Sequence, residues 1–293
     1  MECLHPVLRR IKGTREMVQT PCGICANCRK NFAHMWGTRI YHESRMYDVS
    51  TFLTITYDNE HLPIGPYGIP TLVKKDVQDF MKRFRNWLYP QQVRFFCGAE
   101  YGDQTHRPHY HLALFGVDPH DRRVFDSFEE QDEGWMCRCR AWNKGLSHVG
   151  IVDVGSANYI GGYCLKKVMG KNAKQYYQDK GIIAPFSLMS RRPGIGFDYM
   201  EKYAGEFLKH GSCLVNSVPT GLPRYYKEKL EFKDSEIYHK IMDERQEYLE
   251  KVYSEMWMSS EDLQAKIKQK LEEQKQAEES SKFYERIIKN GKI

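Results

Sequence analysis

The sequence lacks any apolar run long enough to cross a membrane, and its first residues lack the basic-then-apolar pattern of a secretory signal. We therefore expect a cytosolic protein with no membrane partner, in which the nine cysteines do not form disulfides. Proline is absent beyond Pro223, and glycine is absent between Gly221 and Gly291. Because Glu, Lys and Gln dominate residues 227–290, this part of the sequence predicts a long helix or a pair of helices.

The composition is that of a moderately basic chain. Its 293 residues suffice for one large or two modest domains, and 41% hydrophobic residues can supply a core. The formal net charge of +6 is compatible with a polyanionic partner but does not identify one. Nineteen tyrosines and fourteen phenylalanines offer rings on which unpaired bases could stack, although most of these rings are expected in the core.

Three of the cysteines lie at C-x2-C-x2-C spacing near the start of the chain. Cys22, Cys25 and Cys28 form this group, and Cys3 lies upstream as a fourth thiolate for a tetrahedral zinc site. His5 is a substitute fourth ligand, and Cys137 and Cys139 are further, weaker candidates. An iron–sulfur cluster is disfavoured because a nearby fourth Cys followed by Pro is missing. The alternative is a set of reduced thiols at the start of a helix.

A His-Tyr-His sequence leads into an apolar run that ends at Gly116 and predicts a buried strand. Side chains alternate between the two faces of a strand, so His109 and His111 point the same way. Two imidazoles on a rigid element provide half of a metal site, and Glu100 just upstream is a candidate third ligand. Such a site leaves coordination positions open for a phosphate. The alternative is a pair of ordinary surface or core histidines.

Two tyrosines follow about fifty residues downstream. If the segment is helical, Tyr159 and Tyr163 share a face, with Lys166 and Lys167 in the next turn. Hydroxyl groups beside ammonium groups suit covalent phosphoryl transfer, in which cations stabilise the phenolate character of the nucleophile. Simple helix packing is the alternative, and the intervening glycines weaken the helix prediction.

Taken in order, the motifs resemble those of the replication initiation proteins of gokushovirus-type microviruses, which are HUH endonucleases. The residues that carry the resemblance are Pro21-Cys22-Gly23-Ile24-Cys25-Ala26-Asn27-Cys28-Arg29, Phe52-Leu53-Thr54-Ile55-Thr56-Tyr57, Glu100-Tyr101-Gly102-Asp103 with Arg107-Pro108-His109-Tyr110-His111, Tyr159 to Lys167, and Met189-Ser190-Arg191-Arg192-Pro193-Gly194-Ile195-Gly196. They span roughly residues 1 to 200. One departure is that Ala99 separates Gly98 from Glu100, where the pattern has Gly-Glu-Tyr-Gly.

The resemblance implies an α+β fold whose central antiparallel sheet carries the histidines and faces the tyrosine helix. It implies site-specific nicking and joining of single-stranded DNA at a viral origin, which starts and ends rolling-circle replication through a 5′-phosphotyrosine. Mg2+ or Mn2+ would be held by His109, His111 and Glu100, and the tyrosines would attack with help from Lys166 or Lys167. A host helicase and polymerase would act in the cytoplasm of a bacterial host. The rival hypotheses are an HUH relaxase or transposase, and a non-catalytic zinc-bearing nucleic-acid-binding protein.

We divide the chain into a cysteine-cluster and helix segment (1–47), an HUH endonuclease domain (48–223) and a charged helical extension (224–293). The predicted elements are a helix from Cys28 to about Tyr47, strands at 51–57, 93–97 and 149–154, an amphipathic helix at 74–87, and the tyrosine helix capped by Ser156 or Asn158. Residues 117–150 are predicted to be an insertion or a long loop.

Overall fold

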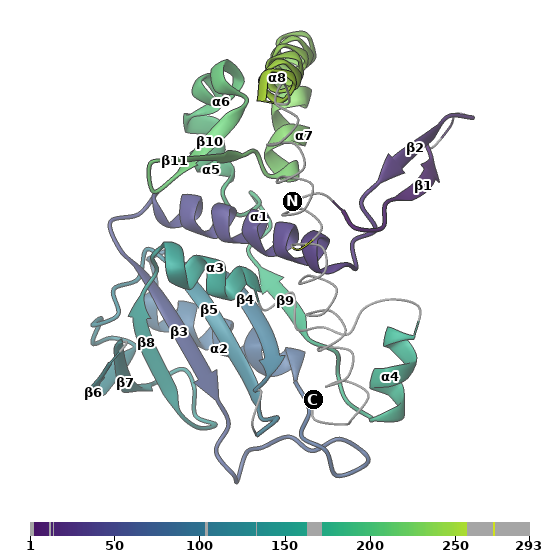
Figure 1. Ribbon diagram of the computed structural model, residues 1–293. Coiled ribbons are helices and arrows are strands. Elements are labelled where there is room, and N and C mark those ends of the chain that lie inside the picture. Colours follow the sequence, from purple (N-terminus) through teal and green to yellow (C-terminus); the bar gives the residue numbers. More distant parts are fainter. Residues whose placement is uncertain are drawn as a thin grey trace. The chain divides into compact units, whose positions relative to one another are not determined.

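A computed structural model describes residues 3–11, 13, 15–102, 105–132, 134–162, 172–256 and 272 (Figure 1). The chain forms two compact units. Residues 32–202 make up the first, here called the sheet unit, and residues 1–31 with 203–293 make up the second, here called the terminal unit. The sheet unit begins and ends earlier than the domain boundaries of 48 and 223 that the sequence suggested.

The sheet unit is built on seven antiparallel strands in the order β6-β7-β8-β3-β5-β4-β9. The strand bounds are β3 Ser50–Thr56, β4 Arg94–Tyr101, β5 Pro108–Phe115, β6 Phe125–Gln131, β7 Gly134–Cys139, β8 Ser147–Ile151 and β9 Phe186–Met189. The helix bounds are α1 Ala26–Ser44, α2 Lys74–Leu88, α3 Val154–Gly162, α4 Ala173–Asp179 and α5 Phe197–Lys202. This large antiparallel sheet with flanking helices confirms the predicted α+β class.

Apolar side chains cover both faces of the sheet because helices pack on each side (Figure 1). The amphipathic helix α2 lies on one face and buries its whole apolar stripe, as its periodicity predicts. Helices α1 and α3 lie on the other face, where Ile40 and Ile160 pack with Phe96 and Phe115. The functional side chains discussed below belong to this second face, so helix α3 lies directly over them.

The prediction of a loop or insertion at 117–150 was wrong, because this segment contains a hairpin, β6–β7, and most of β8. The few inward-facing side chains, such as Phe125 and Cys139, are buried, while many of the β6 residues are exposed. An edge hairpin that packs on one side only carries many polar residues, which is the composition that suggested a loop.

The cap of helix α3 also differs from the prediction. Asp153, not Ser156 or Asn158, precedes the first turn, and its carboxylate accepts the backbone N–H of Ser156 at 2.7 Å. The Ser156 hydroxyl accepts the Asp153 N–H at 2.7 Å in return. This is a capping box, which satisfies two backbone donors at the helix start.

The terminal unit contains two separate hairpins and three helices among the residues described. Strands β1 (Val7–Arg10) and β2 (Met17–Thr20) pair with each other, as do β10 (Ser212–Val215) and β11 (Val218–Gly221). Helices α6 (Ala204–His210), α7 (Arg224–Lys233) and α8 (Ser235–Met256) confirm the predicted helical character as far as residue 256. Across the described part of the chain, none of the helices combines the length and apolar character that a bilayer crossing requires.

Candidate active site and cysteine centre

The candidate active site starts with a hairpin that brings the predicted carboxylate beside the predicted histidines. Strands β4 and β5 pair antiparallel with Glu100 opposite His109, as predicted from their short connection. Side-chain alternation then places Glu100, His109 and His111 on one face of the sheet. The Glu100 Oε1 lies 3.4 Å from His111 Nε2, and both residues are buried, at 3% and 5% exposure. The structure therefore brings the three residues together.

Hydrogen bonds orient both imidazoles. His109 Nδ1 lies 2.7 Å from the carbonyl oxygen of Arg107, which can only accept, so Nδ1 carries the proton and Nε2 keeps its lone pair. His111 Nδ1 lies 2.9 Å from the hydroxyl of Thr54, its neighbour on strand β3. Metal-binding histidines usually have such a partner on the ring nitrogen that does not hold the metal.

The donor set fits a divalent cation, although the side chains are spread more widely than in a compact metal centre. Two imidazoles and a carboxylate with open positions admit Mg2+ or Mn2+. The two rings are nearly parallel, with centroids 6.2 Å apart. Among the residues that the structure describes, it is the cysteine cluster, and not this trio, whose ligand atoms all lie within 4.8 Å of one another. A cation bound by all three side chains would draw them closer.

Tyr159 lies on helix α3 directly beside this trio. Its ring stands edge-on to the imidazole of His111, with centroids 5.5 Å apart, and also contacts Phe52 at 6.1 Å. The residue is 55% exposed, so a substrate can reach it from solvent. The predictions for Tyr163, Lys166 and Lys167 fall outside the described residues. The structure thus brings one predicted nucleophile to the predicted metal ligands.

Two glycines explain how helix α3 approaches so closely. A Cβ atom on Gly161 would lie 2.5 Å from the carbonyl oxygen of Ala33 on helix α1. A Cβ atom on Gly37 would collide with the Asn158 side chain and lie 3.1 Å from the Asn158 Cα. The two helices cross where neither residue has a side chain, and this crossing positions Tyr159. Gly161, which lowers helix propensity, is therefore explained by packing.

Sequence reasoning did not assign a role to two residues that shape the site. Thr54 is predicted on the polar face of its strand, but its bond to His111 is not foreseen by that prediction. Phe52 stacks on His111 at 6.1 Å and also contacts Tyr159. The signal for both is present in the alternation of strand β3, because residues 52 and 54 share the face of the histidines.

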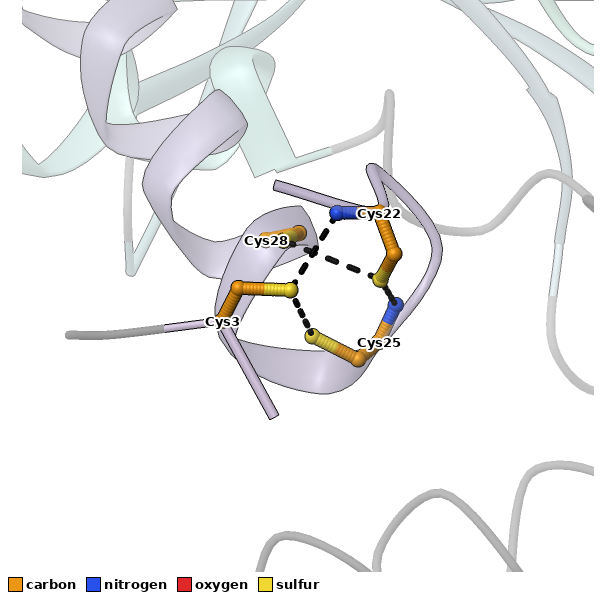
Figure 2. Close-up of side chains that lie close together, drawn as sticks. All are labelled: Cys3, Cys22, Cys25 and Cys28. Atoms are coloured by element: carbon orange, nitrogen blue, oxygen red, sulfur yellow. Dashed lines mark hydrogen bonds between the residues drawn. The ribbon is translucent and has the colours of Figure 1, made fainter. Parts of the chain in front are cut away.

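The second candidate site, in the terminal unit, is the cluster of four cysteines (Figure 2). Cys3 lies 3.9 Å from Cys25 and Cys22 lies 3.9 Å from Cys28, measured between sulfur atoms. A tetrahedral zinc site with Zn–S bonds of about 2.3 Å has sulfur atoms about 3.8 Å apart. The cluster therefore fits a tetrahedral ion such as zinc, with Cys3 and not His5 in the group.

Backbone groups and burial act on these thiols in opposite directions. The N–H of Cys22 donates to Cys3 Sγ at 3.2 Å, and the N–H of Cys25 donates to Cys22 Sγ at 3.3 Å. Burial raises the pKa of Cys28 to about 12. Burial also acts upward on Cys25, but hydrogen bonds from backbone N–H groups outweigh it and lower the pKa of that thiol to about 6. Neighbouring thiolates repel one another, and a bound cation removes this conflict.

The other two candidate cysteines do not join the cluster. Cys137 and Cys139 belong to strand β7 and are buried in the apolar core of the sheet unit. Cys137 Sγ lies 3.7 Å from the hydroxyl of Ser147 on the neighbouring strand. Burial raises the pKa of both thiols, to about 12 for Cys139. Their low weight as metal ligands is consistent with this placement in the core.

Comparisons with known proteins identify the class to which this sheet and site correspond. Residues 50–171 match a family of phage-type replication-associated proteins, described by its ORF2 members, and this segment includes the strands of the candidate active site and Tyr159. The resemblance that the ordered motifs predict is thereby confirmed: the chain is similar to phage replication-associated proteins over most of its length. No solved structure matches the chain.

Three curated relatives are phage proteins. The chain is 28% identical to the replication-associated protein VP4 of Bdellovibrio phage phiMH2K, over 78% of this chain and 76% of that protein. It is 27% identical to the replication-associated protein ORF2 of Spiroplasma virus 4, over 79% of this chain and 74% of that protein. It is 29% identical to the replication-associated protein ORF4 of Chlamydia phage 1, over 74% of this chain but 55% of that longer protein.

Proposed function

We propose that the chain nicks and rejoins single-stranded DNA at a phage origin, and so initiates and terminates rolling-circle replication in the cytoplasm of a bacterial host. The observation that carries the proposal is the placement of Tyr159 beside His111, within a buried group of two imidazoles and a carboxylate. The match to replication-associated proteins of phages favours this role over that of a plasmid relaxase or a transposase.

In the proposed reaction a tyrosine hydroxyl oxygen attacks the phosphorus in line. The bond from phosphorus to the 3′ oxygen breaks, the hydroxyl proton leaves, and the 5′ phosphate becomes an ester of the tyrosine. When bound, Mg2+ or Mn2+ polarises the phosphate and stabilises the departing 3′ oxygen. His109, His111 and Glu100 hold the cation, while Thr54 and the Arg107 carbonyl orient the two rings.

Tyr163, Lys166 and Lys167 complete the proposal. A second tyrosine allows a second transesterification, so that a completed genome is cut and rejoined without ATP, since the tyrosine ester conserves the phosphodiester bond energy. Either lysine neutralises charge that develops on the attacked phosphate. The free 3′ hydroxyl then primes a host polymerase, with a host helicase opening the duplex ahead of it.

The cysteine cluster has a structural role in this proposal. Zinc bound to Cys3, Cys22, Cys25 and Cys28 joins the first residues of the chain to the start of helix α1. Closed four-thiolate sites leave no coordination position for a substrate, so this metal takes no part in the cleavage.

The test uses labelled single-stranded DNA that carries the viral origin, incubated with the protein and Mn2+ and separated on a denaturing gel. We expect a 5′ fragment that migrates with the protein and disappears in the Tyr159→Phe/Tyr163→Phe double variant. Tyr89→Phe is the matched control, because Tyr89 is 82% exposed just beyond helix α2, which packs on the other sheet face. Binding of the DNA without any cleavage would contradict the proposal and favour the non-catalytic hypothesis.

A further inference from the structure

The loop Ser190–Gly196, which joins strand β9 to helix α5, is held from one side by two arginines. Arg94 Nη2 donates to the carbonyl oxygens of Pro193 and Gly194, at 2.9 and 3.3 Å. Arg39 Nε donates to the carbonyl oxygen of Ile195 at 3.0 Å. Three successive carbonyl groups are therefore bound by side chains of the sheet and of helix α1, which fixes the path of the main chain.

A buried glutamate completes this support. Glu43 is 1% exposed, and its Oε1 lies 2.5 Å from Arg94 Nε. Its Oε2 accepts the backbone N–H of Gly196 at 2.5 Å. A buried ion pair is tolerated when both charges have further hydrogen bonds, which is the case here. One carboxylate thus orients the supporting arginine and also binds the end of the loop directly.

The side chains that this support leaves free are two adjacent arginines. Arg191 and Arg192 are exposed, and within the described part of the chain neither guanidinium has a hydrogen bond, ion pair or aromatic partner. The loop contains no acidic residue to balance them. Two like charges side by side on a fixed main chain oppose each other, and an external anion relieves this repulsion.

The loop lies near the row of the sheet that contains His111. In the strand register, His111 is opposite Gly98, and Gly98 is opposite Ser187 on strand β9. Ser190 follows three residues later, about 10 Å along the strand direction at about 3.3 Å per residue. Its backbone N–H donates to Phe95 and so continues the pairing with β4. A DNA strand of a few nucleotides spans this distance.

We infer that Arg191 and Arg192 bind backbone phosphates of the DNA strand a few nucleotides from the nicking site. The inference rests on the proposed function, because it assigns a second contact region to the same substrate. Arginine forks bind phosphate oxygens in pairs, and a fixed main chain reduces the entropy cost of binding. The contact is independent of base sequence, so it holds the strand in register while other contacts select the origin.

The test measures binding of a fluorescent single-stranded origin oligonucleotide over a series of salt concentrations. Removal of one phosphate-binding charge should lower the slope of log affinity against log salt by about 0.7. We expect Arg191→Ala/Arg192→Ala to lower the slope by about 1.4 and to weaken binding. Arg191→Lys/Arg192→Lys should keep the slope, since it keeps both charges. At saturating DNA, cleavage by the alanine variant should proceed at the wild-type rate, because these residues do not touch the reacting atoms.

Arg122 and Arg123 provide the matched control, because they are a second pair of adjacent, exposed arginines. Arg123 is paired with Asp121 at 2.6 Å, and Arg122 lies over the ring of Phe128 at 4.6 Å. Their replacement by alanine should leave the slope unchanged. An unchanged slope in the Arg191→Ala/Arg192→Ala variant would refute the inference even if the wild-type protein nicks DNA. A lowered slope together with a wild-type protein that never nicks would refute the proposed function alone.

Discussion

The ring of Tyr159 stands edge-on to the imidazole of His111, with the two centroids 5.5 Å apart. A helix and a strand far apart in the sequence thereby bring a hydroxyl group next to a buried pair of imidazoles. Neither residue on its own implies chemistry, since isolated tyrosines and histidines are common in packed cores. Their proximity, together with the carboxylate of Glu100, is what makes this face of the sheet a candidate for phosphoryl transfer.

The first prediction concerns a division of labour between the two tyrosines. Tyr159→Phe and Tyr163→Phe should each weaken nicking, and to different extents, while the double variant should form no covalent adduct. Phenylalanine keeps the ring and its contacts with Phe52 and His111, so little is removed except the hydroxyl. Mass spectrometry of the peptide that carries the DNA checks this prediction, and an adduct on any other residue would overturn it.

The second prediction concerns the metal ligands and their support. His109→Ala and His111→Ala should abolish Mn2+-dependent cleavage yet spare most DNA binding, which depends mainly on Lys and Arg contacts with phosphates. Glu100→Ala should be impaired in the same way, though less completely. Thr54→Val removes the partner of His111 Nδ1 and should raise the Mn2+ concentration for half-maximal cleavage by roughly 10- to 100-fold. Wild-type cleavage in either histidine variant would contradict the metal assignment.

The third prediction tests the helix crossing that positions Tyr159. Gly37→Ala inserts a methyl group against Asn158 and should destabilise the fold by about 1–3 kcal/mol. Nicking should fall as well, because helix α3 must move away from the sheet. Gly155→Ala, in the first turn of the same helix, is the control, since its added methyl group meets nothing closer than 3.4 Å. Thermal unfolding and nicking rates, measured for both variants, separate the two effects, and equal behaviour of the variants would refute the argument.

The fourth prediction concerns the cysteine cluster. Protein purified without chelators should contain about one zinc per chain, because four thiolates at tetrahedral spacing prefer zinc to magnesium. Removing this zinc should lower the thermal stability, whereas exchange of Mg2+ for Mn2+ at the other site should not. Elemental analysis checks the content, with Cys213→Ser, a cysteine outside the cluster, as the control variant. A preparation free of both zinc and iron would exclude the assignment.

Much of the site could be predicted from the sequence because strands and helices have fixed periods. The shared face of His109 and His111 follows from the two-residue repeat of a strand, and Glu100 follows from the short turn between β4 and β5. The hairpin β6–β7 could not be predicted in this way, since its exposed edge carries many charged residues. The cap by Asp153 and the crossing at Gly37 depend on local geometry and on tertiary contacts, which no repeat in the sequence encodes.

The last prediction concerns residues 224–293, which follow every motif with a proposed chemical role. We expect their removal to leave nicking of a short single-stranded origin oligonucleotide largely intact, and to impair stability, assembly or recruitment of host proteins. The structure indicates where the cut should be made. Tyr226 and Leu230 on helix α7 are fully buried, and Tyr226 stacks on Phe207 at 5.8 Å. Ending the chain at residue 223 therefore exposes apolar surface.

Two truncations separate these effects. A chain that ends at Asp234 keeps helix α7 with its buried side chains, and should be as stable as the full chain to within a few degrees of its melting temperature. A chain that ends at residue 223 should unfold at a lower temperature, because it lacks two buried side chains that contribute about 2–5 kcal/mol each. Both should still nick, because the predicted ligands and nucleophiles lie before residue 203. A truncated chain that is folded by circular dichroism, binds the oligonucleotide and fails to cleave it would show that the C-terminal region contributes to the active site.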